Sequence, residues 1–399
     1  MNPQENQHHL LKGLLFLYVS LCLSGCAFTG TALTTSGTAG EPHLVWNGSH
    51  FGIVYYHTPT PGSWPVINMV KVDKNANIIS SNTNVGSIPH FYQPFYLSDL
   101  VWNNDNKQFA FAYTKGKVIH FIRMDANLNM LTPTLEIKFN VPVTSNEHPT
   151  LVDLSLVWNH ESKEYGLTYI TKEHPYLQDR HDDVYISRIS ANGSYIGPYE
   201  RFHLVSCPGD CEKTSLAYNT SNGQYAFSYL KNNYPTQKVM IGLYSPGGNV
   251  SEHTLMSGWN AGVGKATRIV HDPNSHEYMV VALKAKPGSL NGHEIGYQIA
   301  GSNGAPQGSY YVLTGTAGYN EITSAVPYLT TVDNNYLIAA SEQPQIHVWM
   351  ALESGFIASD WAYTKSNVKS WHPSLAMAGS IYMAWIQDGT LYFGVAKKE

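Results

Sequence analysis

The chain has 399 residues, of which 43% are hydrophobic and only 13% are charged, compared with roughly 25% charged residues in an average soluble domain. Its net charge is −5 and it contains no basic run. These values argue against nucleic-acid binding, which needs a concentrated positive surface. A polar but weakly charged surface is typical of secreted and cell-envelope proteins.

The N-terminal segment has the pattern of a targeting signal. Residues 1–13 are polar, with Lys12 as their only Lys or Arg, and Leu14 to Leu23 form an apolar run of ten. This run is too short for a membrane span and suits a signal peptide. It ends in Leu23-Ser24-Gly25-Cys26, and no later run approaches eighteen apolar residues.

This tetrapeptide resembles the lipobox of bacterial lipoproteins. The resemblance covers residues 1–26 and implies cleavage before Cys26, whose thiol and new amino group would carry acyl chains such as palmitate. Ala27, in place of the Asp that often retains lipoproteins in the inner membrane, favours the outer membrane in a Gram-negative host. The alternative is an ordinary signal peptide in which Cys26 stands by chance.

Seven copies of one pattern fill the rest of the chain. Each copy has an apolar strand, a polar turn and a second strand led by an aromatic residue, as in Leu100-Val101-Trp102-Asn103 followed by Phe109-Ala110-Phe111-Ala112-Tyr113. The equivalent positions are Trp46, Trp102, Trp158, Tyr218, His271, Val332 and Met377, spaced by 56, 56, 60, 53, 61 and 45 residues. Repeats of about 40–50 residues with four strands are the signature of β-propeller blades, so the chain resembles seven-bladed propellers.

The second strands support this architecture because they alternate large and small side chains. In the second copy Phe109 and Phe111 share one face, whereas Ala110 and Ala112 share the other. Neither face carries charge, so each sheet is expected to lie between two others, with its small face receiving the aromatics of the next blade.

The last copy ends after its third strand, Leu391 to Val395, and would leave the ring open. We therefore expect residues of about 30–36 to pair with that strand and close the circle; the alternative is a disordered tether. The predicted organisation is a signal peptide over 1–25, a lipidated Cys26 with a short tether and closing strand over 26–40, and an all-β propeller of four-stranded antiparallel blades over 41–399.

Two of the four cysteines remain after the signal peptide and Cys26 are set aside. Cys207 and Cys211 flank Pro208-Gly209-Asp210, between the third and fourth copies. Since the cell envelope is oxidising, we predict a local disulfide. A redox pair lacks the Cys-x-x-Cys spacing, and a zinc site lacks two further ligands nearby. The sequence indicates no cofactor and no metal.

Long loops on one face of a propeller carry the candidate binding residues. They come from the connections between blades and between second and third strands. The leading candidates are the aromatic residues of these loops, which suit either a protein hot spot or sugar stacking: Phe91, Tyr92, Phe95, Tyr96, Trp259, Tyr319 and Trp371. The alternative is that they pack the loops onto the ring.

Ionisable clusters give weaker signals. The segment Asp179 to Asp183 could bind a metal or exchange protons, but its residues are consecutive and would point to opposite faces of a strand. The sixth position after each lead aromatic is mostly polar, and we expect these residues to ring the mouth of the central channel: His57, Lys115, Thr171, Lys231, Lys284, Glu342 and Asp388.

The sequence favours a binding or assembly module over an enzyme. Sialidases resemble this chain only in their propeller repeat; their Arg cluster and their Ser-x-Asp-x-Gly-x-x-Trp turns are missing. A Gly-x-Ser-x-Gly elbow is also absent. We expect a lipid-anchored envelope protein that binds a protein or a glycan through the aromatic loop face. The alternative is a carbohydrate-active hydrolase that uses carboxylates there, such as Asp153, Asp183 and Glu321.

Overall fold

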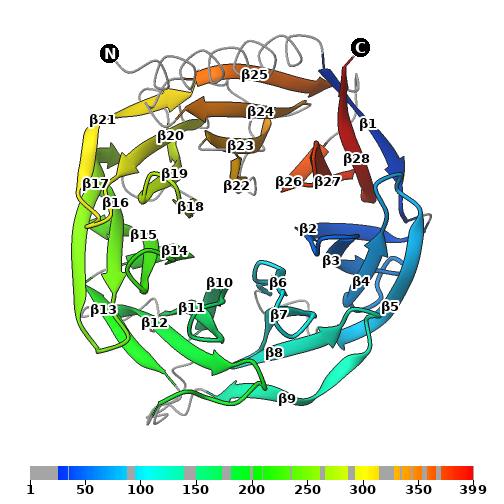
Figure 1. Ribbon diagram of the computed structural model, residues 1–399, viewed down its shortest axis with the longest axis horizontal. Coiled ribbons are helices and arrows are strands. Elements are labelled where there is room, and N and C mark those ends of the chain that lie inside the picture. Colours follow the sequence, from blue (N-terminus) through cyan, green and yellow to red (C-terminus); the bar gives the residue numbers. More distant parts are fainter. Residues whose placement is uncertain are drawn as a thin grey trace, which may run out of the picture.

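The computed structural model describes residues 26–398, except for 35, 88–94, 139–149, 173–180, 198–200, 209, 234–235, 261–265, 286–292, 314–327, 333–334, 343–344, 353–356 and 365–369. The described residues form strands and no helix, so none of them belongs to a helix that could cross a membrane. The strands make seven four-stranded antiparallel sheets arranged as the blades of a ring (Figure 1), which confirms the predicted propeller.

Blades 1 to 6 each use four consecutive strands, ordered from the ring axis outward. Blades 1 and 2 comprise β2 (Thr38–Trp46), β3 (Phe51–Thr58), β4 (Val66–Val72) and β5 (Ile78–Ser87), then β6 (Val101–Asn103), β7 (Gln108–Lys115), β8 (Val118–Asp125) and β9 (Met130–Lys138). Blades 3 and 4 comprise β10 (Thr150–Asn159), β11 (Glu164–Lys172), β12 (His181–Ser190) and β13 (Phe202–Pro208), then β14 (Asp210–Asn219), β15 (Gln224–Asn233), β16 (Thr236–Tyr244) and β17 (Val250–Asn260).

The second half of the ring follows the same plan until its last blade. Blades 5 and 6 comprise β18 (Thr267–Asp272), β19 (Glu277–Ala285), β20 (His293–Ala300) and β21 (Pro306–Leu313), then β22 (Tyr328–Val332), β23 (Asn335–Glu342), β24 (Gln345–Leu352) and β25 (Ile357–Thr364). Blade 7 has β26 (Ser370–Met377), β27 (Ile381–Gln387) and β28 (Thr390–Lys398), and takes β1 (Cys26–Ala32) as its outer strand.

The closing strand is therefore confirmed, although it begins earlier than expected. It pairs antiparallel with β28 from Cys26, opposite Lys398, to Ala32, opposite Tyr392, rather than over residues of about 30–36. Gly30 lies over the indole ring of Trp385, and a Cβ at this position would overlap that ring. A glycine there lets the closing strand approach blade 7 closely.

The alternation of large and small residues builds the contacts between blades. A Cβ added to Gly52 of blade 1 would lie 2.6 Å from the ring of Phe109 in blade 2, and Gly166 of blade 3 meets Tyr225 of blade 4 in the same way. The aromatic residues are fully buried. The small face of each of these second strands thus receives the lead aromatic of the next blade, as predicted.

Polar bonds repeat from blade to blade as well. In blades 2, 3 and 4 the Asn that follows the marker residue donates from Nδ2 to the lead tyrosine hydroxyl of the next blade: Asn103 to Tyr165 at 3.1 Å, Asn159 to Tyr225 at 3.3 Å and Asn219 to Tyr278 at 2.8 Å. These groups are buried, and leaving one of them unpaired would cost about 1–3 kcal/mol. The repeated Trp-Asn and Tyr-Asn pairs are therefore part of the ring's internal hydrogen bonding.

The predicted disulfide is also confirmed. Cys207, in the outer strand of blade 3, is bridged to Cys211, in the inner strand of blade 4, and both side chains are completely buried. The carboxylate of Asp182 accepts a hydrogen bond of 3.0 Å from the Cys211 amide. The short crossover between these blades is thus held at both ends.

Candidate functional site at the ring axis

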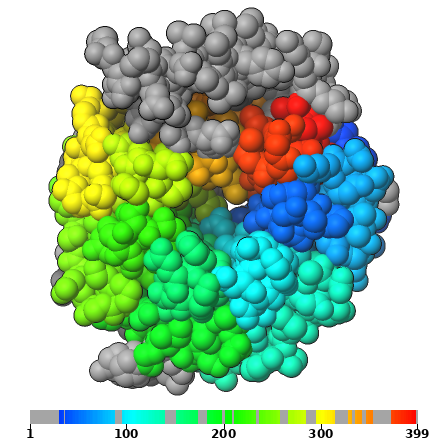
Figure 2. Space-filling view, in the orientation of Figure 1, coloured from blue at the N-terminus to red at the C-terminus, as the bar shows by residue number. Residues whose placement is uncertain are grey.

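Antiparallel pairing gives the ring two distinct faces. The inner strand of every blade begins at the face that carries the connections between blades and the loops between second and third strands, which we call the loop face. It ends at the face that carries the turns between first and second strands and between third and fourth strands, which we call the turn face. Figure 2 shows the ring hollowed at its centre.

A cavity of about 90 Å³ lies where the inner strands begin, and every blade contributes to its wall. Its lining residues come from the N-terminal parts of the inner strands or from just before them: Glu41, Pro42, His43, Tyr96, Leu97, Asp153, Lys213, Arg268, Tyr328, His372 and Pro373. The cavity therefore lies on the ring axis, at the loop face, and we call it the axial cavity.

Four of these wall residues share an unusual backbone conformation. Glu41, Asp153, Lys213 and His372 have φ angles of 44°, 54°, 53° and 52°. Each lies at an irregularity in the pairing of its inner strand with the second strand of the blade. A left-handed conformation is unfavourable for residues other than glycine, and β-bulges commonly redirect a side chain near a functional site. The repeated bulge places four ionisable side chains in the cavity wall.

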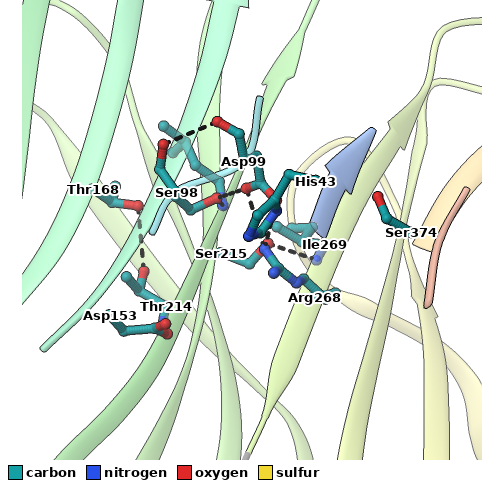
Figure 3. A network of polar contacts seen from close by, with 12 residues as sticks. His43, Ser98, Asp99, Asp153, Thr168, Thr214, Ser215, Arg268, Ile269 and Ser374 are labelled. Atoms are coloured by element: carbon teal, nitrogen blue, oxygen red, sulfur yellow. Dashed lines mark hydrogen bonds and ion pairs between the residues drawn. The ribbon is translucent and has the colours of Figure 1, made fainter. Parts of the chain in front are cut away.

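An ion pair spans the channel beneath these residues (Figure 3). The Arg268 guanidinium of blade 5 donates from one nitrogen to both carboxylate oxygens of Asp99 in blade 2, at 2.9 and 3.1 Å. The same carboxylate accepts a 2.8 Å hydrogen bond from the Ser155 hydroxyl, and His43 Nδ1 lies 3.6 Å from it. Side chains from blades 1, 2, 3 and 5 therefore meet at one carboxylate.

The pKa values of two carboxyl groups in this network shift in opposite directions. Burial alone would raise the pKa of Asp99, but Arg268, His43 and Ser155 outweigh it and hold that pKa well below its ordinary value. Burial raises the pKa of Asp153, and the opposing effects of Lys213, Arg268 and the Thr214 amide do not overcome it. Compared with an ordinary carboxyl group, ionisation is thus easier for Asp99 and harder for Asp153.

Aromatic and imidazole groups complete the wall. Burial, reinforced by Asp153, raises the pKa of Tyr96 to about 12, and burial with Asp99 does the same for Tyr328. Burial lowers the pKa of His372, which favours its neutral form. The Lys213 ammonium lies 5.5 Å from the centre of the Tyr96 ring, a cation–π contact. The cavity thus combines hydroxyl, imidazole, carboxyl and ammonium groups.

Serine hydroxyls hold the inner strands in place around this network. Ser155, Ser215 and Ser374 accept hydrogen bonds from the backbone amides of Leu216, Ile269 and Leu44, respectively, each in the next blade. These distances are 3.0, 3.2 and 2.9 Å. Because each amide belongs to a neighbouring inner strand, the hydroxyls fix the spacing of the strands that carry the site.

The structure brings few of the expected aromatic residues to the cavity. Tyr96 lines it, whereas Phe95 is half-buried and packs against Tyr56 and Tyr113. Phe91, Tyr92 and Tyr319 lie outside the described residues, and Trp259 and Trp371 are described only as strand backbone. Phe95 therefore has a packing role, as in the alternative in which the aromatic residues hold the loops against the ring.

The three candidate carboxylates do not form one site in the described structure. Asp153 lines the cavity, and Thr214 donates its amide proton to it at 2.6 Å. Asp183 lies on β12, the third strand of blade 3, and contacts groups of β13; Glu321 lies outside the described residues. Of the two candidates that the structure describes, only Asp153 therefore lies in the cavity wall.

The surroundings of Asp183 resemble a catalytic triad in composition but not in geometry. Ser206 Oγ donates to Asp183 Oδ1 at 2.6 Å and lies 3.1 Å from His203 Nε2. The same Nε2 atom lies 3.1 Å from Asp183 Oδ1. A triad needs one imidazole nitrogen on the serine and the other on the carboxylate, so this cluster is not arranged as a triad. Among the described residues, no set of three His, Cys, Asp or Glu side chains is placed to hold a metal ion.

The residues expected at the mouth of the channel, at the ends of the second strands, do not line the axial cavity. The cavity wall comes from inner strands, and it includes none of the five expected residues whose side chains the structure describes: His57, Lys115, Thr171, Lys231 and Asp388. The second strand of each blade lies outside the first, which separates its end from the axis.

Comparison with known proteins adds no functional assignment. The sequence matches no known protein family and no curated protein. Among solved structures, the acylaminoacyl peptidase of Pyrococcus horikoshii is 10% identical with a TM-score of 0.49; the match covers 91% of this chain and 52% of the peptidase, so this chain spans about half of its length. The β-propeller domain of the Trilobed protease from Pyrococcus furiosus is 10% identical with a TM-score of 0.49, over 90% of this chain and 94% of that domain.

Proposed function

We propose that this chain is a membrane-anchored binding module of the cell envelope, which holds part of a partner protein in the axial cavity. The observation that carries the proposal is the convergence of all seven blades on one cavity, with Glu41, Asp153, Lys213 and His372 held there in left-handed conformations. Such strain persists where the surrounding structure enforces it, and it concentrates at binding and catalytic sites.

The size and charge of the cavity favour a group of a larger partner over a free small molecule. Its volume of about 90 Å³ is well below the roughly 300–1,000 Å³ of drug-sized ligand sites. The wall carries both acidic and basic groups, and Arg268 Nε is buried without a hydrogen-bond partner among the described residues. These features suit a polar side chain or a chain end that is presented by a protein.

Anchoring is supported by the N-terminal pattern. The apolar run Leu14 to Leu23 and the lipobox-like Leu23-Ser24-Gly25-Cys26 immediately precede the closing strand, which starts at Cys26. An acylated Cys26 would fix the propeller to a membrane without a transmembrane helix. In the native host, the wild-type chain should float with membranes, and Cys26→Ser should be released into the soluble fraction.

The binding proposal is tested by crosslinking and pull-down from the native envelope. We expect one discrete protein to be captured by the wild type and lost with Asp153→Asn or Lys213→Gln. Asp105→Asn is the matched control, because Asp105 pairs with Lys163 in the turns of the opposite face. A partner that is retained by both cavity variants would contradict the proposed site.

A second candidate function rests on the opposite pKa shifts of Asp99 and Asp153. Glycoside hydrolases use two carboxyl groups whose pKa values are shifted in opposite directions by their surroundings. If the cavity performs this chemistry, wild-type protein should cleave a polysaccharide in a substrate panel, and Asp153→Asn should lose turnover while it keeps binding. If the wild type cleaves no polysaccharide and captures a protein partner, the hydrolase is rejected and the binding module is supported.

A further inference from the structure

The closing strand brings the chain into the fold at the turn face. β28 starts next to its hairpin with β27, at the loop face, and runs to Lys398 at the turn face. Since β1 is antiparallel to β28 and Cys26 pairs with Lys398, Cys26 also lies at the turn face. The axial cavity opens at the other end of the blades.

No spacer separates Cys26 from the folded ring. Cys26 is itself the first residue of β1, and pairing with β28 begins there. A flexible spacer of ten residues could extend over up to about 35 Å and would let the ring rotate freely. Because there is no such spacer, a lipid group attached to Cys26 would lie directly beside the turn face of blade 7.

Exposed apolar side chains lie at the same face of the next two blades. Ile78 and Ile79 begin the outer strand of blade 1 and are 51% and 48% exposed, and Met130 begins the outer strand of blade 2 and is 42% exposed. Both strands start directly after a turn of the turn face. Figure 1 shows β1, β5 and β9 as successive outer strands of the ring. We call Ile78, Ile79 and Met130 the apolar rim.

Basic residues beside Cys26 favour contact with an anionic lipid surface. Lys397 and Lys398 stand opposite Ala27 and Cys26 in the strand register. Lys74, on a turn of blade 1, is exposed, and its ammonium donates to the carbonyl of Ala378 in blade 7. The Asp73 carboxylate of the same turn accepts hydrogen bonds from its own loop. Basic residues next to an anchor add attraction to anionic lipids, about 1 kcal/mol for each Lys near the surface.

We propose that the apolar rim rests on the lipid bilayer to which Cys26 is anchored, so that the axial cavity faces away from that membrane. The proposal rests on the anchoring part of the proposed function. The rim adds a second contact to the acyl chains of Cys26, and this orientation lets a partner reach the cavity from the aqueous side.

Hydroxyl-radical footprinting tests this orientation. The acylated chain is placed on vesicles of phosphatidylethanolamine and phosphatidylglycerol, and its oxidation is compared with that of soluble Cys26→Ser. Oxidation of Met130, Ile78 and Ile79 should fall several-fold on the vesicles. Trp64, which is 45% exposed in a loop of the opposite face, is the matched control and should be oxidised equally in both samples.

The outcomes separate anchoring from orientation. If the native chain carries no acyl group, the anchoring proposal fails. The orientation can then still be tested by coupling a maleimide lipid to a chain prepared from residue 26 onward, in which Cys26 is the one thiol left because Cys207 and Cys211 are bridged. On the vesicles, protection of Trp64 with Met130 still oxidised would overturn the orientation, as would equal oxidation of both residues with and without lipid.

Discussion

Asp99 and Arg268 are separated by 169 positions in the sequence, yet their side chains form an ion pair of 2.9 Å across the ring axis. The two side chains are 25% and 17% exposed, so neither charge is fully hydrated. The pair joins blade 2 to blade 5, whereas most other polar contacts between blades join immediate neighbours. It therefore fixes the width of the channel on which the site depends.

Removing one charge of this pair should strongly destabilise the protein. In Asp99→Asn the Arg268 guanidinium stays in the channel without its carboxylate, which should cost about 3 kcal/mol. Urea unfolding measures the loss. The control Asp105→Asn breaks an exposed pair with Lys163 and should leave the unfolding midpoint unchanged. Equal effects of both variants would show that the channel pair is no stronger than a surface one.

The two carboxyl groups of the site predict opposite dependences of stability on pH. Because the folded pKa of Asp99 is depressed, its contribution is present above the unfolded pKa of about 4 and is lost as the pH falls through the folded value. The folded pKa of Asp153 is raised, so its contribution is present below the unfolded pKa and is lost as the pH rises through the folded value.

Asp153→Asn should therefore stabilise the protein at neutral pH, and the gain should disappear at acidic pH. The Asn side-chain oxygen can still accept the Thr214 amide proton, so the hydrogen bond is kept while the buried charge is removed. Thermal unfolding at pH 7 and at pH 4 measures the difference. A variant that is less stable than wild type at pH 7 would show that ionised Asp153 stabilises the fold.

The closing strand should be sensitive to a single added side chain. Gly30→Leu should sharply lower the melting temperature, because even a Cβ at this position overlaps the Trp385 ring. Gly247→Ala is the control, since its Cβ would have no neighbour within 4 Å. Deletion of residues 26–32 should have at least the effect of Gly30→Leu, because it exposes the edge of β28. An unchanged melting temperature after the deletion would mean that the ring does not depend on its closure.

The serine links between inner strands should each be measurable. Ser374→Ala leaves the buried Leu44 amide without its acceptor, at the junction of blades 7 and 1, and should cost about 1–3 kcal/mol. The exposed Ser49→Ala serves as the reference and should have little effect. Equal unfolding free energies for the two variants would show that the hydrogen bond of Ser374 does not stabilise the junction of blades 7 and 1.

The fold could be predicted because the same packing contact between blades recurs along the sequence. Each blade needs a lead aromatic, and a small face in the preceding blade to receive it, so the pattern recurs at readable spacing. The closing strand was expected from the missing fourth strand of blade 7. Its exact bounds were not, because they depend on its register with β28 and on contacts such as that of Gly30 with Trp385, which lies far away in the sequence. The disulfide was expected from the short spacing of Cys207 and Cys211 and from the oxidising location that the N-terminal pattern indicated.

The site was less readable because its residues differ from copy to copy. The third position before the marker residue reads His43, Asp99, Ser155, Ser215 and Arg268 in the first five copies. Each is a polar residue just before the apolar residues that precede the marker, and this signal could have located the channel. The bulges at Glu41, Asp153, Lys213 and His372 could not be read, because they arise from strand pairing and none of these residues is a glycine.

Photo-crosslinking from the axial cavity in intact cells tests the central claim most directly. A photoreactive amino acid in place of Lys213 lies in the cavity wall, and the same amino acid in place of the exposed Tyr310 lies on the outer strand of blade 5. We predict one discrete protein adduct from position 213 and none from position 310. An adduct from position 310 alone, or from neither position, would contradict a partner-binding site at the ring axis.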